Sequence, residues 1–363
     1  MATNNPFRHI YYDAKHVAHE DGSDIASTRW PSLFSTPWKL QLQRLRGGKR
    51  AGVELLTVDN GLLAFDILPT RGMGLWQGRL GNLRLGWNSP IHGPVNPAFI
   101  NLLDRGGVGW LDGFDEWLCR CGLSSLGPPN IDPKTGEQLT LHGRIANQPA
   151  HHLEARIQLE PPFAIEVVGH VEETTPFLKG WELRTTYRTF PGSNRLIVED
   201  EIINQRSQPQ ELYLLYHINF GPPLLGQGSH VELPHDSIEP RDQRAKDGLE
   251  TWNVYEPPTP GYAEQVYFFR PKPQADGMAW ATLTDPTGKA SCRLSWKHAE
   301  LPCFCVWKNS MPESDGYVTG LEPATCFPLI RPKERDAGRA VVVPPDASYR
   351  CGLTLEVNSD QGA

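Results

Sequence analysis

Apolar residues recur at every second position along much of this chain, and this alternation constrains its fold more than any other feature. The pattern is clear over residues 153–159, 181–188 and 349–357, with further apolar runs at 165–171 and 196–203. Successive side chains of a β-strand point to opposite faces of a sheet, so the pattern predicts half-buried strands. Helical periodicity is weak, with residues 36–46 as one candidate helix. We therefore predict an all-β fold, a large antiparallel β-sandwich.

Turn sequences separate the predicted strands. Asp59-Asn60-Gly61 lies between apolar runs at 53–58 and 62–68, and Asn-Gly tolerates the positive φ of a tight hairpin turn. We expect residues 1–45 to wrap over the surface and residues 46–358 to form a single sandwich domain. The segment 221–265 is polar, Pro-rich and poorly periodic. So long a loop in a compact domain is more often functional than idle.

The charge balance argues against several classes of partner. The chain has 35 basic and 42 acidic residues, a net charge of −7, and no run of five basic residues. Nucleic-acid and membrane-surface binding both need clustered Lys and Arg, so we expect neither partner. The first residues lack the pattern of a secretory signal, and no apolar run is long enough to cross a membrane. We expect a cytoplasmic protein, and the sequence does not fix its oligomeric state.

Seven cysteines, an odd number, favour free thiols in a reducing compartment. Two Cys-x-Cys pairs occur, Cys119/Cys121 and Cys303/Cys305. On a strand, residues two apart share a face, so a metal site is one interpretation. Structural zinc sites usually show a wider Cys spacing. We therefore predict buried small hydrophobic residues and no metal at these pairs.

The predicted strand 211–220 has an apolar face and a second face that carries His217 and Asn219. One interpretation is a core histidine whose nitrogens are satisfied by neighbours. The alternative is a catalytic imidazole that faces a cleft, with Asn219 beside it at the substrate. Histidine suits that role because its pKa lies nearest neutrality, so it can both donate and accept a proton.

Three further segments hold candidate site residues. Glu322, between an apolar strand and Pro323, is either a solvated strand end or a base in a partly dry cleft, where desolvation raises its pKa. His142 precedes a glycine that permits an unusual turn. Arg71 could offer several donors to sugar hydroxyls, or could form a surface ion pair.

Tryptophan is abundant, with eleven residues. Most are expected in the core, but Trp110 and Trp307 lie near the other candidates in sequence, and an indole ring offers an apolar platform with one donor for a sugar. The chain has no G-x-G-x-x-G, P-loop, H-E-x-x-H or G-x-S-x-G motif. Nucleotide cofactors and serine hydrolase chemistry therefore lack support.

The order of these motifs resembles that of the aldose 1-epimerase, or galactose mutarotase-like, superfamily, over roughly residues 50 to 357. The resemblance implies that Arg71 binds sugar hydroxyls and that His142 orients the sugar. It implies that His217 protonates the ring oxygen and that Glu322 takes the proton of the anomeric hydroxyl. Asp242 is the best match to a sugar-binding aspartate that follows the catalytic histidine in the family.

The implied reaction interconverts sugar anomers by acid–base ring opening and needs neither metal nor nucleotide. The sequence departs from galactose mutarotase after His217 and in the stretch 110–123. Two alternatives therefore stay open. One is a carbohydrate-binding protein without catalysis. The other is a lyase or isomerase of oxidised or acidic sugars on the same scaffold.

Overall fold

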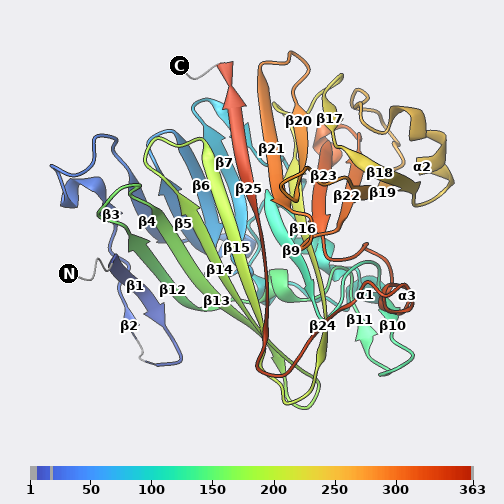
Figure 1. Ribbon diagram of the computed structural model, residues 1–363, viewed down its shortest axis with the longest axis horizontal. Helices are drawn as coiled ribbons and strands as arrows, with labels where there is room; N and C mark the ends of the chain where they lie inside the picture. Colours follow the sequence, from blue (N-terminus) through green and yellow to red (C-terminus); the bar gives the residue numbers. More distant parts are fainter. Residues whose placement is uncertain (1–5, 17–18, 361–363) are drawn as a thin grey trace.

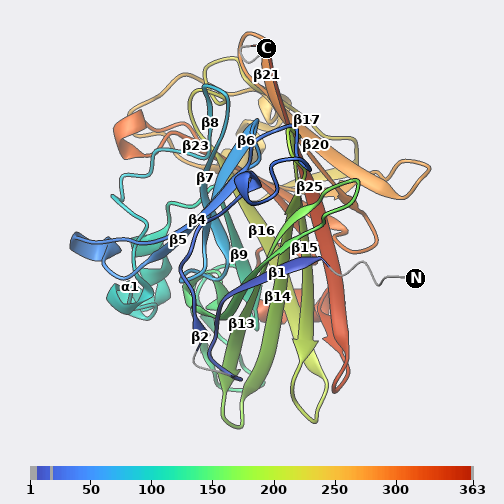
Figure 2. The same cartoon turned by 90° about the vertical axis from the view of Figure 1, so that its left-hand side faces the viewer.

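Two large antiparallel sheets form the protein, in a computed structural model that describes residues 6–16 and 19–360 (Figure 1). The sheets have ten and thirteen strands, and the prediction of an all-β sandwich is confirmed. Turned by 90°, the molecule shows them as two layers, with β6, β7 and β9 in one and β13, β14 and β25 in the other (Figure 2).

The ten-stranded sheet is built mainly from the middle and the end of the chain. Its strands, in spatial order, are β17 (His230–Glu232), β20 (Met278–Thr284), β21 (Ala290–Lys297), β25 (Ser348–Ser359), β15 (Arg195–Asn204), β14 (Lys179–Thr189), β13 (Ile165–Thr175), β12 (Ala150–Ile157), β1 (Phe7–Asp13) and β2 (His19–Glu20).

The thirteen-stranded sheet carries the candidate site. Its main path runs through β18 (His235–Pro240), β19 (Gln265–Pro271), β22 (Cys303–Asn309), β23 (Val318–Ala324), β16 (Gln210–Phe220), β9 (Leu118–Leu123), β7 (Gly74–Leu80), β6 (Leu63–Leu68), β5 (Glu54–Asp59), β4 (Lys39–Arg44) and β3 (Ile25–Ala26). Off this path, β24 (Val341–Val343) pairs with β16 and β8 (Leu83–Leu85) with β7. A separate hairpin joins β10 (Asn130–Ile131) and β11 (Gln138–Leu139).

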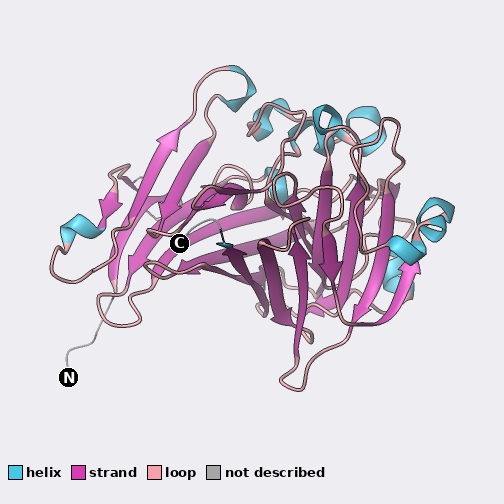
Figure 3. Cartoon of the chain, turned by 90° about the horizontal axis from the view of Figure 1, so that it is seen from above, coloured by secondary structure: helices cyan, strands magenta, loops and turns pink. Residues whose placement is uncertain are grey.

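Helical segments are short and lie in the connections outside the sheets (Figure 3). The α-helices are α1 (Asp104–Gly107), α2 (Gln243–Asp247) and α3 (Arg331–Asp336). The 3-10 turns are η1 (Ser27–Arg29), η2 (Gly48–Arg50), η3 (Pro97–Phe99), η4 (Gly109–Gly113), η5 (Ile145–Asn147), η6 (Leu249–Thr251) and η7 (Glu313–Asp315). Among the described residues, no helix has the length and apolar character needed to cross a membrane.

The main core fills the space between the two sheets, and strand β16 shows how the sequence builds it. Leu214, Tyr216 and Ile218 of β16 are fully buried in this core. The alternate residues Tyr213 and Leu215 instead join a second apolar cluster on the other face of the same sheet, beneath the loops of residues 87–147. Because side chains alternate along a strand, His217 must lie on that loop-covered face.

A buried ion pair fixes β9 against the opposite sheet. Arg120 of β9 donates from Nη2 to Oδ1 of Asp200 on β15 at 2.9 Å, and both side chains are fully buried. Tyr216 donates its hydroxyl proton to the other oxygen of Asp200 at 2.7 Å. Arg120 therefore points into the main core, and its neighbours Cys119 and Cys121 point toward the second cluster.

The described part of residues 1–45, which was expected to wrap over the surface, contributes strands to both sheets. Strand β1 pairs with β12, and β4 pairs with β5. Residues 1–5 and 17–18 of this segment lie outside the described residues. The helix predicted over residues 36–46 is wrong, because Leu40 is buried as part of β4 and this short amphipathic stretch fits either period. The predicted loop 221–265 contains β17, β18 and α2.

A candidate acid–base site on the thirteen-stranded sheet

His217 and Glu322 lie opposite each other on the neighbouring strands β16 and β23. The register pairs Leu215 with Ala324 and Ile218 with Leu321, which places His217 across from Glu322. The Nε2 atom of His217 is 3.1 Å from Oε1 of Glu322. The structure thus brings together the two residues predicted as acid and base, although 104 residues of chain separate them.

Asn219 fixes the proton on the His217 ring. Its Nδ2 donates to the carbonyl oxygen of Glu116 at 2.9 Å, so its Oδ1 is directed at Nδ1 of His217, 2.6 Å away. An amide oxygen only accepts, which requires that Nδ1 carries a proton. In neutral His217, Nε2 is then a bare acceptor that faces Glu322. Asn219 is fully buried, and its side chain contacts His217; its predicted place at the substrate stays a prediction.

Burial sets the charges of this pair. The side chains of His217 and Glu322 retain only 6% and 3% of their exposure. Desolvation, with a contribution from His142, lowers the pKa of His217 to about 3. Desolvation also raises the pKa of Glu322 well above its usual value. Burial thus favours the uncharged form of both groups, with one proton on Nδ1 of His217 and one on Glu322.

Aromatic rings enclose His217 on the face away from the main core. The ring centres of Phe114, Trp307, His142 and Trp110 lie 5.0, 5.5, 5.6 and 6.2 Å from that of His217. They come from loop residues 109–117, from β22 and from the turn before η5. The structure thus gathers the predicted residues Trp110, Trp307 and His142 around the acid–base pair, and Phe114 joins them.

The turn at His142 explains the glycine that follows it. His142 adopts a left-handed φ of 55°, and Gly143 has a φ of 73°. A Cβ atom on Gly143 would lie 2.3 Å from the carbonyl oxygen of Gly122, so no larger residue fits there. Glycine tolerates both the dihedral angle and the close approach. In this turn the ring centre of His142 lies 4.8 Å from that of Trp110.

Three buried polar atoms around His217 lack a hydrogen-bond partner among the described residues. They are Nε1 of Trp110, Nδ1 of His142 and Oε1 of Glu322, whose 3.1 Å contact with His217 does not meet hydrogen-bond geometry. Buried polar atoms are almost always hydrogen-bonded in native proteins. Such a group of atoms at one place indicates a site that a polar ligand can satisfy.

Arg71 supports the site from beneath the loop. Its side chain is 1% exposed, and Nε donates to Glu116 Oε1 at 2.6 Å. The two Nη atoms donate to the carbonyl oxygens of Val95 and Gly113 and to Oδ1 of Asn147. These bonds use four of the five N–H groups of the guanidinium. Since the carbonyl of Glu116 accepts from Asn219, Arg71 is joined to His217 through Glu116 and Asn219.

Asp242 is the predicted residue that lies at the periphery. Its Oδ1 accepts from the backbone N–H of Ala245 and caps α2. Its other oxygen pairs with Arg241 at 2.8 Å. Arg241 in turn pairs with Glu264, which accepts the indole N–H of Trp307 at 2.7 Å. Asp242 is thus joined to Trp307, one of the rings around His217, through the intervening side chains of Arg241 and Glu264.

Sequence reasoning did not assign Glu116 and Phe114 to the site. It also did not assign the Cys121 thiol, which lies beside His142, or the Cys305 thiol, which lies beside Glu322. The Cys-x-Cys spacing was the available signal for the thiols, because it places both cysteines of each pair on one face of β9 or β22. The prediction of buried, free thiols is confirmed. Strands β16 and β23 separate β9 from β22, so the two pairs lie about 14 Å apart at usual strand spacing and cannot share one ion.

Comparison with known proteins supports the fold and identifies relatives. DUF4432, a domain family of unknown function, matches residues 50–357. A crystal structure of a protein from Klebsiella pneumoniae, provisionally assigned as an aldose 1-epimerase, superposes with a TM-score of 0.94 at 32% identity, covering 98% of this chain and 92% of that one.

Two more distant structures share the fold. A galactose mutarotase-like protein from Clostridium acetobutylicum has a TM-score of 0.59 at 12% identity, covering 88% of this chain and 99% of that one. A galactose 1-epimerase from Lactobacillus acidophilus has a TM-score of 0.56 at 12% identity, covering 89% and 99%. No curated protein matches the sequence.

Proposed function

We propose, from the premise that this chain belongs to the DUF4432 family within the aldose 1-epimerase (galactose mutarotase-like) superfamily, that it is an isomerase that interconverts the anomers of a sugar. The observation that carries the proposal is the contact between His217 and Glu322, buried together beside the unpartnered polar atoms of Trp110 and His142. The anomeric oxygen and the ring oxygen of a cyclic sugar are bonded to the same carbon. Two groups 3.1 Å apart can therefore reach both oxygens at once.

The proton chemistry begins with the proton on Glu322. Transfer from Glu322 to Nε2 of His217 gives a carboxylate and an imidazolium. Glu322 then takes the proton of the anomeric hydroxyl while His217 protonates the ring oxygen. The bond between the anomeric carbon and the ring oxygen breaks as the carbonyl double bond forms. Rotation about the adjacent carbon–carbon bond presents the other carbonyl face, and the reverse transfers close the ring to the other anomer.

The environment of the pair returns it to the uncharged state after ring opening. Glu322 is then again protonated and His217 again neutral, which is the distribution that burial favours. The cost of forming the ion pair is therefore regained as the two protons move to and from the sugar. Opposite pKa shifts in a contacting acid and base are a pattern of acid–base active sites.

The surrounding side chains fit a small polar ligand with an apolar face. Trp110 and Trp307 offer ring surfaces, while His142 Nδ1 and Trp110 Nε1 offer polar atoms to hydroxyl groups. Because His217 and Glu322 are nearly inaccessible to solvent, we infer that the aromatic rings around His217 move when a sugar enters.

The cytoplasmic location of the protein stays a prediction.

Anomer exchange measured by NMR saturation transfer tests this proposal. A panel of neutral, acidic and deoxy sugars would be compared with wild type and His217→Gln. We expect exchange above the buffer rate for one class of sugar, lowered about 100- to 10,000-fold in the variant. Binding without exchange would support a carbohydrate-binding protein, and turnover of an oxidised sugar alone would support a lyase or isomerase.

A further inference from the structure

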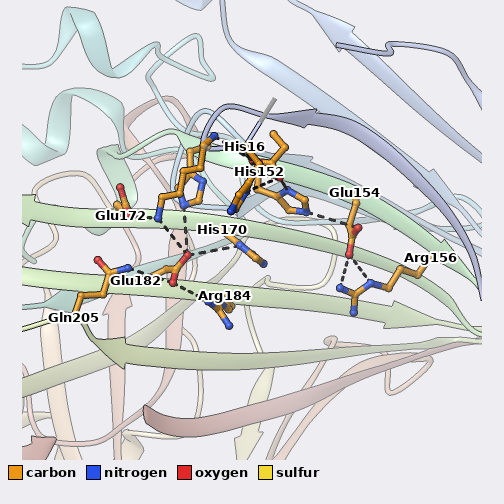
Figure 4. Close-up of polar contacts among 12 residues, drawn as sticks. His16, His152, Glu154, Arg156, His170, Glu172, Glu182, Arg184 and Gln205 are labelled. Carbon is orange, nitrogen blue, oxygen red and sulfur yellow. Dashed lines mark hydrogen bonds and ion pairs between the residues drawn. The ribbon is translucent and has the colours of Figure 1, made fainter. Parts of the chain in front are cut away.

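Three neighbouring strands of the ten-stranded sheet bring two histidines and a glutamate together on the face away from the main core. His151 lies on β12, His170 on β13 and Glu182 on β14. Figure 4 shows His170 and Glu182 side by side across their strands. His151 is the extra residue of a β-bulge, because the register pairs Ala150 with Val171 and His152 with His170. Bulges commonly redirect a side chain next to a functional site.

The spacing of their ligand atoms is close to that of a metal site. Oε1 of Glu182 lies 3.6 Å from Nε2 of His151 and 3.7 Å from Nδ1 of His170. One ligand atom from each of the three residues lies within 4.8 Å of the others. Zinc bonds of about 2.0–2.1 Å in a tetrahedral arrangement place ligand atoms about 3.3–3.4 Å apart. Side-chain rotations that move each ligand atom by about one ångström or less would therefore bring the three atoms to this spacing.

The ring nitrogens of His151 also favour a ligand at this place. Both ring nitrogens of His151 are buried without a hydrogen-bond partner among the described residues.

Basic side chains share this surface and bear on the charge of the site. Lys15 Nζ lies 3.7 Å from Oε1 of Glu182, the oxygen that faces both histidines. Arg184 donates to the other oxygen of Glu182 at 3.0 Å and fixes the orientation of the carboxylate. The cluster lines an open cavity of about 350 Å³, so an ion has access from solvent.

We propose that His151, His170 and Glu182 bind a divalent transition-metal ion of the zinc type. Two imidazoles and one carboxylate form a ligand set that zinc commonly takes, with the remaining position open to water. Lys15 would turn away from Glu182 as the ion binds. The site lies on the opposite outer face of the sandwich from His217, so it is separate from the sugar chemistry. An ion held by three strands binds the folded state and stabilises it.

Titration of the metal-free protein with Zn²⁺, and with Co²⁺ as a spectroscopic probe, tests this site. The variants are Glu182→Gln, which preserves the size of the side chain, and His170→Ala, with His92→Ala as an exposed control. We expect one equivalent of Zn²⁺ to bind wild type and the control and to raise their melting temperature. The affinity should fall by at least about 10- to 100-fold in Glu182→Gln and in His170→Ala.

Circular dichroism would establish that each variant is folded. An anomalous difference peak at the zinc edge between the three side chains would locate the ion. Absence of stoichiometric binding by wild type would overturn the proposal. Equal affinity of wild type and both ligand variants would overturn it as well, because binding would then lie elsewhere.

Discussion

Replacement of Arg71 by methionine tests whether the buried guanidinium positions the acid–base pair. The substitution removes the cation beside Glu116 and the bonds to the carbonyl oxygens of Val95 and Gly113. Removal of one partner of a buried ion pair costs about 3–5 kcal/mol, because the other charge is left uncompensated. The lost carbonyl bonds overlap with this figure, so we expect a loss of about 4 kcal/mol in the free energy of unfolding.

Urea unfolding would measure this loss, with Arg79→Met as the matched control. Arg79 pairs with Asp59 at 3.2 Å, but its side chain is 60% exposed. Exposed pairs contribute at most about 1 kcal/mol, so the control should unfold near the wild-type midpoint. The double variant Arg71→Met/Glu116→Gln should recover part of the loss, since the unpaired carboxylate is gone. A loss below about 1 kcal/mol in Arg71→Met would refute the reasoning.

Kinetics separate a positioning role of Arg71 from a sugar-binding role. Arg71→Lys retains the charge but cannot span the four acceptors. If Arg71 acts through Glu116 and Asn219 on His217, kcat falls while KM changes little. A rise in KM with an unchanged kcat would instead show that Arg71 binds the sugar directly.

Three further predictions concern the atoms around the pair. Asn219→Asp places a carboxylate 2.6 Å from Nδ1 of His217 and should raise the pKa of His217 by about 1–3 units in an NMR titration; an unchanged pKa would show that the two side chains do not interact. Because the pKa of His217 is lowered from 6.5 to about 3 and that of Glu322 is raised above 4.5, the contribution of the pair to stability is greatest between about pH 4.5 and 6.5. It falls toward pH 3, because folded His217 does not bind the proton that unfolded His217 binds below pH 6.5. It also falls as the pH rises above 6.5, because folded Glu322 keeps the proton that unfolded Glu322 has released. Urea midpoints at pH 6.5 and 8 should show this second loss in wild type and not in Glu322→Gln, and equal losses would contradict the raised pKa. Trp110→Phe keeps a ring but removes the unpartnered N–H, so KM for the sugar should rise about 2- to 12-fold at unchanged stability, and an unchanged KM would exclude that N–H from binding.

The strands could be predicted because their side chains alternate between two environments. Residues of β13, β14, β15 and β25 face the main core at every second position, and the alternation visible in the sequence records that burial. In β16 both faces are buried, and His217 and Asn219 were recognisable as polar residues on an otherwise apolar strand. Residues 36–46 were misassigned because so short a segment does not distinguish the two periods.

The geometry of the site could be predicted only in part. The pairing of β16 with β23 joins segments far apart in the chain, and register between such strands depends on tertiary packing. Glu116 was out of reach because it holds Asn219 through its backbone carbonyl, which every residue type has. Arg71 and Asp242 were recognisable as polar side chains in the right order, but their partners, Glu116 and Ala245, appear only in the folded structure.

The rate of anomer exchange in Glu322→Gln tests the central claim most directly. Glutamine keeps the size of the side chain but cannot take the proton of the anomeric hydroxyl, and Glu313→Gln on the surface is the matched control. With the sugar that wild type turns over fastest, we predict a rate about 100- to 10,000-fold lower in Glu322→Gln and unchanged in the control. Wild-type exchange in folded Glu322→Gln would contradict the account, because the carboxyl group would then take no part in the reaction.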